Sequence, residues 1–391
     1  MLSVLFVAGL LVVAFVGFNI GGSSTGVAFG PAVGSGTVST VAAAALMTGF
    51  ALLGGWTVGR NVIETMGGEI VDPGLFTLQT SVIVLLFIGG ALLVSNLFGV
   101  PASTSMTAVG AIAGLGAARG GLHMAVLGEI VTWWLVAPLL AFWVCAVVGR
   151  YLYPYLDHYF AIDQSDGPLL ELDRRHSVPR PRLAPGTTPR EVVGSLLVVG
   201  IACYMAFSAG ASNTANAVAP LVGADQVSVN AGILLAAASI GVGAFTIARR
   251  TLATVGSGLT DLPLLAALIV EVVSASLITF LSAIGIPASL AVSATMCIVG
   301  LGWGRATRTA SVRDAVSGEE EAAVSVNALA AESETEQPVP GIGEEDPAEL
   351  TASDLFDPST TGRVISLWIL TPSLAAAAAY GVFTALTLSG A

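Results

Sequence analysis

Long apolar runs alternate with short polar breaks along most of this chain. A helix that crosses the hydrocarbon layer of a membrane needs about 20 apolar residues. Runs of about that length cover roughly residues 2–20, 38–58, 75–98, 124–148, 193–210, 228–247, 262–285 and 364–389. The first run has no basic segment before it and no clear cleavage site, so we expect a retained helix rather than a signal peptide. The pattern predicts an all-α polytopic membrane protein.

Two polar blocks divide the apolar runs. Residues 151–192 carry five of the 14 arginines, and we interpret them as a cytoplasmic linker because short basic loops stay on the cytoplasmic side. Residues 305–362 carry 13 of the 26 acidic residues with little apolar periodicity, so we expect a disordered cytoplasmic loop. The blocks leave residues 1–150 as a first transmembrane repeat, 193–304 as the first part of a second repeat and 363–391 as its last helix.

The two halves resemble each other at four places, in the same order. The first three matches have nearly the same spacing between the halves, whereas the members of the fourth lie further apart. The acidic block inserted into the second half accounts for this increase, so the pattern indicates an internal duplication. The matches are AFGPAVG (28–34) with AVAPLVG (217–223), NVIETMGGEI (61–70) with RTLATVGSGL (250–259), FGVPAS (98–103) with IGIPAS (284–289), and TWWLVAP (132–138) with SLWILTP (366–372).

Duplicated halves are typical of secondary transporters, often with inverted topology, and their substrate sites lie where Gly- or Pro-interrupted helices of the two halves meet. We therefore predict two inverted repeats with broken or re-entrant helices. The candidate interruptions are residues 21–36 with 210–223, and 99–118 with 285–304. With the linker in the cytoplasm, this arrangement puts both termini outside.

A broken helix inside a membrane frees backbone N–H groups, which attract anions, and carbonyl groups, which attract cations. In PASTSM, a proline is followed by three hydroxyl residues, Ser103 to Ser105, at the expected start of a helix. No Arg or Lys lies within the interrupted segments, so hydroxyl groups and backbone dipoles would hold a tetrahedral oxyanion there. The alternative, that these Ser, Gly and Pro residues only pack or kink helices, stays open.

The interrupted segments resemble the inorganic phosphate transporter (PiT) family. Members carry in each half a motif like G-A-N-D-x-A-N-x-x-G-P-x-x-G, followed later by P-V-S-T-T-H. The first motif is matched here by GGSSTGVAFGPAVGSG and GASNTANAVAPLVG, and the second by PASTSMTAVGAIAG and PASLAVSATMCIVG. The resemblance covers all of the chain except its two polar blocks. It implies an all-helical inverted-repeat fold, usually a homodimer, that moves phosphate with a coupling cation, commonly sodium.

The resemblance, together with the hydroxyl-rich breaks, selects candidate site residues. Both motif aspartates are absent here, and the motif histidine is replaced by Met106 and Val292, which puts cation coupling in doubt more than anion binding. The candidate anion-binding residues are Ser23, Ser24, Ser103, Thr104, Ser105, Ser212, Asn213, Asn216 and Ser289. The candidate cation-binding residues are Ser24, Asn213, Asn216 and Glu271.

Glu271 lies within an apolar span, LIVEVVSASL. An ionised acid at mid-bilayer costs several kcal/mol, so such a residue is a functional candidate by default. The alternatives are that Glu271 is neutral, lies near the interface, or pairs with Arg249 or Arg250.

The charge balance changes the expected sodium affinity. The net charge is -12, and all 14 basic residues are arginines, which suits a protein that works in concentrated salt, although a GC-rich genome is an alternative explanation. Raising external sodium about 40-fold offsets a loss of about 2 kcal/mol in sodium-binding free energy. We therefore hypothesise a low-affinity sodium site of Ser, Asn and backbone oxygens.

The sequence thus predicts a secondary transporter of inorganic phosphate in the cytoplasmic membrane, with sodium as coupling ion. A sulfate or other oxyanion permease is the first alternative, and a transport-silent scaffold acting through its acidic loop is the second. We find no HExxH, GxSxG or GxxxxGK[ST] motif, so we expect neither an enzyme nor an ATP-driven pump. We expect no metal site, no other cofactor and no nucleic-acid partner.

Overall fold

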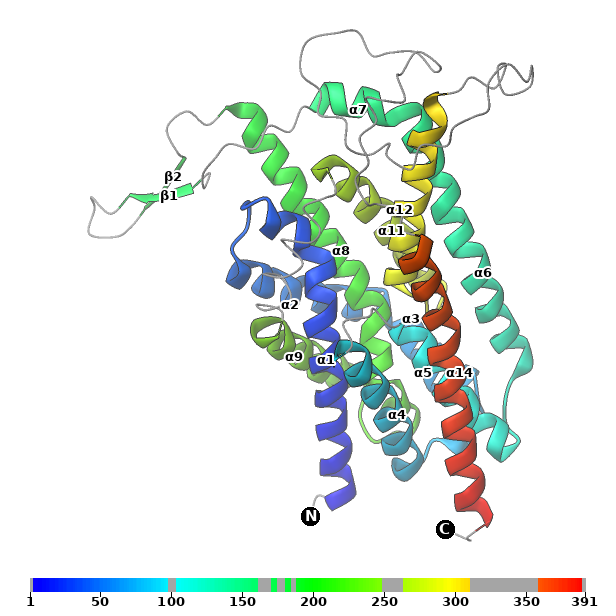
Figure 1. The fold of residues 1–391 in the computed structure, drawn as a ribbon. Helices are drawn as coiled ribbons and strands as arrows, with labels where there is room; N and C mark the ends of the chain where they lie inside the picture. Colours follow the sequence, from blue (N-terminus) through cyan, green and yellow to red (C-terminus); the bar gives the residue numbers. More distant parts are fainter. Residues whose placement is uncertain are drawn as a thin grey trace, which may run out of the picture.

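The computed structural model describes residues 3–97, 103–160, 170–173, 180–183, 188–247, 263–309 and 358–388, and almost all of them are helical (Figure 1). The described strands, β1 (Leu170–Asp173) and β2 (Arg180–Leu183), form one antiparallel pair with Leu170 opposite Leu183. The chain is therefore an all-α bundle with a small hairpin in its linker, as the apolar runs predict.

The predicted linker, 151–192, is partly helical, because α7 (Tyr153–Phe160) and the first residues of α8 (Pro189–Gly223) lie within it. Before the strand pair lie α1 (Val4–Gly34), α2 (Thr40–Thr57), α3 (Gly59–Glu64), the π-helical η1 (Thr65–Glu69), the 3-10 turn η2 (Pro73–Leu75), α4 (Leu78–Leu97), α5 (Thr104–Arg119), α6 (Met124–Val147), the π-helical η3 (Val148–Leu152) and α7 (Tyr153–Phe160). After it lie α8 (Pro189–Gly223), α9 (Val229–Thr246), α11 (Leu264–Ala283), α12 (Leu290–Ala306), the 3-10 turn η4 (Thr307–Thr309) and α14 (Pro358–Leu388).

Two constant differences in residue number, which we call the first and second offsets, relate positions in the first half to positions in the second. The first offset is the separation of Pro31 from Pro220, and the second offset, slightly smaller, is that of Pro101 from Pro287. Helices α2 and α9 are both 18 residues long, and the first offset relates their starts as well as the ends of α1 and α8. Helices α4 and α11 are both 20 residues long, and the second offset relates their starts. Helix boundaries therefore recur at the separations that the repeated segments predict.

Similar capping chemistry sets some of these boundaries. Ser39 precedes α2 and Ser228 precedes α9 at corresponding positions. The side chain of each serine accepts a hydrogen bond from a backbone N–H in the first turn of its helix. Such N-caps satisfy donors that the helix itself leaves free. The same local signal therefore starts a helix at the same place in both halves.

Within the described residues, seven helices are long and apolar enough to cross a membrane: Val4–Gly34, Thr40–Thr57, Met124–Tyr159, Glu191–Gly223, Val229–Thr246, Leu264–Ala283 and Trp368–Leu388. The remaining predicted span, 75–98, is α4, whose apolar part Leu78–Val94 is shorter. The chain is therefore a multi-pass membrane protein.

The prediction that residues 21–36 and 210–223 interrupt their helices is wrong. Helix α1 runs on to Gly34 with Pro31 inside it, and α8 runs on to Gly223 with Pro220 inside it. Two threonines in these stretches bond back to their own helix: Thr25 donates to the carbonyl of Gly21 (2.6 Å), and Thr214 donates to that of Gly210 (2.7 Å). The two prolines therefore lie within continuous helices.

The glycines in these stretches allow close helix contacts. A Cβ atom added to Gly21 would lie 2.0 Å from the carbonyl oxygen of Ile240 on α9, and one added to Gly210 would lie 2.1 Å from that of Ala51 on α2. The first offset relates the two glycines to each other, and it also relates their two partners. Helix α1 therefore packs on α9 as α8 packs on α2, and each half contributes one helix to each contact.

The second predicted interruption is present where the structure describes it. Helix α11 ends at Ala283, Gly285 takes a left-handed conformation (φ 79°), and α12 begins at Leu290 after the N-cap Ser289. In the first half, Ser103 is the N-cap of α5. The preceding residues 98–102 lie outside the described residues. Of the predicted interruptions, the break between α11 and α12 is therefore the one that the described residues contain.

The two termini lie at one end of the bundle, and α7 and the strands lie at the other (Figure 1). This agrees with the prediction that both termini share a side opposite the linker. The acidic block predicted for 305–362 lies outside the described residues, except for its first five and last five positions.

Replacing Gly210 by alanine tests the close contact of α8 with α2. The new methyl group would overlap the backbone of α2, so we expect a loss of about 1–3 kcal/mol of stability. Gly200 on the same helix has no atom within 4 Å of an added Cβ, so Gly200→Ala is the matched control and should be neutral or stabilising by up to about 1 kcal/mol. Thermal unfolding of the purified protein in detergent measures both, and equal melting temperatures for the two variants would contradict the packing model.

Candidate functional site

A buried polar cluster forms where the start of α5 and the middle of α8 meet the break before α12. The hydroxyl groups of Ser105 and Ser212 both donate to the carbonyl oxygen of Ala288, at 2.9 and 2.7 Å, and lie 3.2 Å from each other. Ser105 comes from the first half of the chain, whereas Ser212 and Ala288 come from the second. The cluster therefore joins the two halves.

Two asparagines on α8 extend the cluster. Asn216 Nδ2 donates to Ser105 Oγ and to Asn213 Oδ1, both at 3.1 Å. Asn216 is fully buried, and its Oδ1 has no hydrogen-bond partner. A buried carbonyl oxygen without a donor is costly unless a ligand, an ion or a water molecule satisfies it. The cluster therefore has one acceptor left to be satisfied.

Serine N-caps fix the helix starts beside the cluster. Ser103 Oγ accepts from the backbone N–H of Met106 (3.3 Å), and Ser289 Oγ accepts from that of Val292 (3.4 Å). Both caps are buried. The starts of α5 and α12 therefore lie within the protein, where their partial positive charge is poorly screened by water.

The cluster is chemically neutral. Its side chains are hydroxyl groups and amides, and none of its hydrogen-bonded members is a carboxylate or a cation. Hydroxyl and amide groups can turn donors toward a tetrahedral oxyanion, and their oxygens can face a cation. The arrangement is therefore suited to binding and releasing a small ion, and it has no nucleophile–base pair for covalent chemistry.

The cluster brings together only some of the predicted site residues. Ser105, Ser212, Asn213 and Asn216 are joined by hydrogen bonds, and Ser103 and Ser289 cap the adjacent helices. Thr104 is half-buried at the start of α5. Ser23 bonds to the Asn19 and Ile20 carbonyls of its own helix, and Ser24 beside it is half-buried. The part that each residue plays in binding stays a prediction.

Comparisons with known proteins identify the family. A model of the phosphate transporter family (PHO4) matches residues 20–379. The chain belongs to the phosphate transporter family. It is 31% identical over 299 residues to the sulfate permease CysP of Bacillus subtilis, covering 75% of this chain and 76% of that protein. It is 25% identical over 361 residues to a putative phosphate permease of Haemophilus influenzae, covering 74% and 86%.

A solved structure described as the sodium-dependent phosphate transporter has the same fold as this family member. The TM-score is 0.68 over 99% of this chain and 100% of that one, at 17% sequence identity. Family and structural neighbour are transporters, which fits a protein that is not an enzyme. Family membership also implies an oxyanion substrate and a lipid environment.

The cluster has no polar equivalent at the related positions of the other half. By the second offset Ser105 corresponds to Ala291, and by the first offset Asn216 corresponds to Val27. Ser212 corresponds to Ser23, whose hydroxyl group bonds within α1. The hydrogen-bonded cluster therefore has no counterpart at the positions that the two offsets relate to it.

An apolar group takes the place of the family histidines. Met106 and Val292 pack with Trp368 and the partly buried Trp134, and Trp134 Nε1 donates to the carbonyl of Pro287 (2.8 Å). The sequence shows these tryptophans only as part of a repeated segment. Their position beside the break was not predicted, because packing across the halves determines it.

Glu271 lies apart from the hydrogen-bonded cluster, on α11. Its side chain is 4% exposed, and neither carboxyl oxygen has a hydrogen-bond partner. Arg249 and Arg250, its proposed partners, lie outside the described residues. Glu271 is the eighth of the 20 residues of α11.

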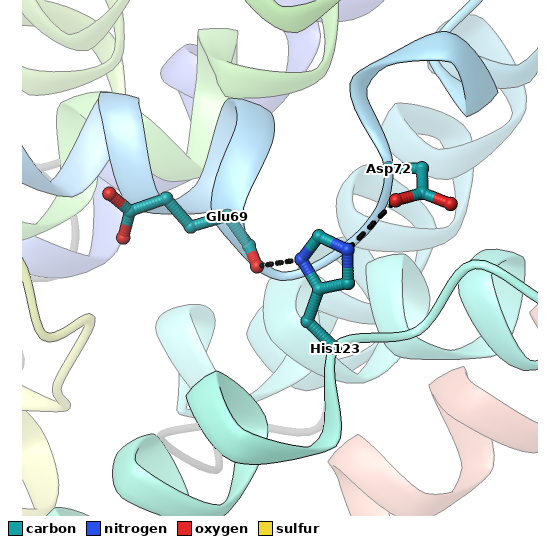
Figure 2. Close-up of polar contacts among 3 residues, drawn as sticks. All are labelled: Glu69, Asp72 and His123. Carbon is teal, nitrogen blue, oxygen red and sulfur yellow. Dashed lines mark hydrogen bonds and ion pairs between the residues drawn. The ribbon is translucent and has the colours of Figure 1, made fainter.

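A second polar group, which we name the His123 clasp, consists of His123, Asp72 and the backbone of Glu69 (Figure 2). His123 Nδ1 lies 2.8 Å from the Glu69 carbonyl oxygen, and Nε2 lies 2.8 Å from Asp72 Oδ1. Both partners are acceptors, so the doubly protonated imidazolium satisfies them best. The hydrogen bond to Asp72, and then that to Glu69, raise the pKa of His123 above its usual value of 6.5.

The clasp predicts a pH-dependent stability. Because its folded pKa is raised, the stabilisation from His123 is fully present below pH about 6.5 and is lost as pH rises through the folded value. The melting temperature of the wild type should therefore exceed that of Asp72→Asn by more at pH about 6 than at pH about 9. Thermal unfolding at both values measures this difference, and a constant gap would argue that the imidazole stays neutral.

Proposed function

We propose that this family member is a secondary transporter of a small tetrahedral oxyanion, phosphate or sulfate, across the cytoplasmic membrane. The observation that carries the proposal is the neutral polar cluster, in which Ser105 of one half and Ser212 of the other meet at a helix break. In lipid, irregular backbone is tolerated only where it is buried in protein or lines a water-filled cavity. A site at the contact of two halves is also where a rocking motion can expose it to either side.

We further propose that the halves form inverted repeats with re-entrant helices around the breaks. The recurring helix boundaries and the paired glycine contacts support this. So do the helix directions in Figure 1, where α1 and α6 run away from the end that holds the termini and their counterparts α8 and α14 run toward it. A homodimer, as the family resemblance implies, is part of the same proposal.

Phosphate is the substrate named for most of the related permeases, and sulfate is a second candidate with its own support. Sulfate carries no proton at neutral pH and needs only donors, whereas protonated phosphate also needs an acceptor for its O–H group. The cluster supplies hydroxyl and amide donors and no carboxylate, and one relative, 31% identical, is a sulfate permease. In the described conformation the two serine hydroxyl groups already donate to Ala288, and the free atom is the acceptor Asn216 Oδ1. The free acceptor favours protonated phosphate, and the support for sulfate is the relative.

We propose sodium as a coupling ion. The solved structure of similar fold is described as sodium-dependent, and Asn216 Oδ1 is a buried oxygen without a donor. With Asn213 it would form a weak site of neutral oxygens. Half-saturation of uptake at only a few millimolar sodium would contradict a low-affinity site.

Counterflow in proteoliposomes tests the transport function. Vesicles loaded with unlabelled sulfate or phosphate should take up the labelled ion transiently, with sodium equal on both sides. The ion that supports the faster exchange is the better substrate. Absence of exchange with both ions would refute the proposal and favour a scaffold.

Removing one hydroxyl group from the cluster should weaken substrate binding. Ser212→Ala takes one donor from the site, and a neutral hydrogen bond is worth about 1 kcal/mol, so half-saturation should rise about fivefold. Ser23→Ala is the matched control, since Ser23 is the counterpart of Ser212 and bonds to its own helix. Concentration-dependent counterflow measures both variants. Equal effects at the two positions would show that the cluster is not the site.

A further inference from the structure

Helix α11 carries an unusual set of buried polar atoms without partners. Both carboxyl oxygens of Glu271 and the hydroxyl groups of Thr279 and Ser282 are buried and have no hydrogen bond within the described protein. Buried polar groups are normally paired, so each exception requires an explanation. By the second offset, Glu271 and Thr279 correspond to Leu85 and Leu93 of α4. The polarity of α11 is therefore not required to build this helix.

These atoms lie along the contact between α8 and α11, which we call the seam. Glu271, Ser274 and Ser282 are spaced at i, i+3 and i+11, which places them on one face of a helix. This face contacts α8: the Ser274 hydroxyl group lies 3.8 Å from Met205 Sδ, and the Ser208 hydroxyl group donates to the Ala275 carbonyl (3.0 Å). One turn further along α8, Ser212 reaches Ala288. The seam therefore runs from Glu271 to the neutral cluster.

No positive charge in the described parts of the neighbouring helices pairs with Glu271. Helices α3, α6, α8 and α12 pack against α11, as α1 does more weakly. Of their arginines, Arg60 bonds Asn230 Oδ1 and Arg305 lies 4.4 Å from the ring centre of Tyr153. The titratable groups on the described side chains of these helices are Arg60, Glu64, Glu129, Cys145, Glu191, Cys203, Tyr204, Cys297 and Arg305, and α1 has none.

A bare proton suits this site better than a sodium ion. Hard metal cations need several oxygen ligands at once. The residues that share the face of Glu271 are mainly apolar, Leu268, Ala275 and Ile278, and the Ser274 hydroxyl group already donates to the Val270 carbonyl (2.6 Å). A buried carboxylate without counter-charge or donor is strongly disfavoured, whereas a protonated carboxyl group is not. The described conformation therefore holds Glu271 in its neutral form.

We propose that Glu271 is the proton-binding residue of the transport cycle, so that a proton enters with the oxyanion in addition to the sodium ion proposed above. The inference rests on the proposed transport function and assigns Glu271 to the proton, and not to sodium. A carboxylate exposed to one side takes one proton from water there, and after the bundle rearranges, water on the other side accepts it. The seam of buried hydroxyl groups on α8 and α11 links this event to the oxyanion cluster.

Reconstituted full-length protein tests the proposal when only the proton gradient can drive uptake. Sodium is held equal on both sides, the membrane potential is clamped at zero, and the external solution is about one pH unit more acidic. One proton per oxyanion then predicts accumulation of labelled sulfate or phosphate of about tenfold at equilibrium. Wild-type counterflow without any gradient is measured in parallel. Absent counterflow refutes the transport function, whereas normal counterflow without proton-driven accumulation refutes the proton proposal alone.

Substitutions test whether Glu271 is the residue that binds the proton. Glu271→Gln mimics the protonated side chain, so it should keep counterflow within about twofold and lose the tenfold accumulation. Glu271→Asp retains a titrating group and should retain accumulation. Glu129→Gln, which removes an exposed acid from α6, is the matched control and should behave as wild type. Undiminished proton-driven accumulation by Glu271→Gln would overturn the assignment.

A binding measurement keeps the assignment testable even if Glu271→Gln fails to transport. Proton uptake or release by the detergent-solubilised protein is followed with a pH indicator in weak buffer while sulfate or phosphate is added. The wild type and Glu129→Gln should exchange protons with the solution on binding, and Glu271→Gln should not. Equal proton exchange by wild type and Glu271→Gln would exclude Glu271 as the coupled group.

Discussion

Backbone polar groups inside a membrane must be satisfied by the protein itself, and this constraint shapes the centre of the molecule. The break between α11 and α12 frees the carbonyl group of Ala288 from any helix. Two serines, one from each half of the chain, donate to that oxygen, and Asn216 donates to one of them. Hydroxyl groups from α5 and α8 therefore satisfy this carbonyl oxygen at the break, and the same groups form the candidate site.

Glycine provides the second structural condition, which is close approach of the helices. Gly21 and Gly210 lie where α1 meets α9 and α8 meets α2, and no side chain fits at either contact. Each of these contacts joins one helix of the first half to one helix of the second. Without interhelical hydrophobic driving force in lipid, such close backbone packing is a main source of helix association.

The two halves of the chain are more alike in their helix boundaries than in their polar residues. Helix boundaries remain aligned between the halves, whereas Asn216 corresponds to Val27, Ser105 to Ala291 and Glu271 to Leu85. The architecture persists because packing and capping constrain every helix boundary. Two polar residues of the cluster, Ser105 and Asn216, in contrast, are not repeated at the related positions.

The sequence by itself determined the membrane class, the duplicated halves, the helix that starts at Ser103 and most members of the polar cluster. Apolar length, repeated proline spacing and N-cap chemistry are local signals, and they can be recognised without knowledge of the fold. Only the tertiary structure decided that 21–36 and 210–223 are continuous helices, because a glycine that breaks a helix and a glycine that packs one look alike in sequence. It alone also identified the Ala288 carbonyl as the centre of the cluster and left Glu271 without a partner, since both depend on which helices meet in space.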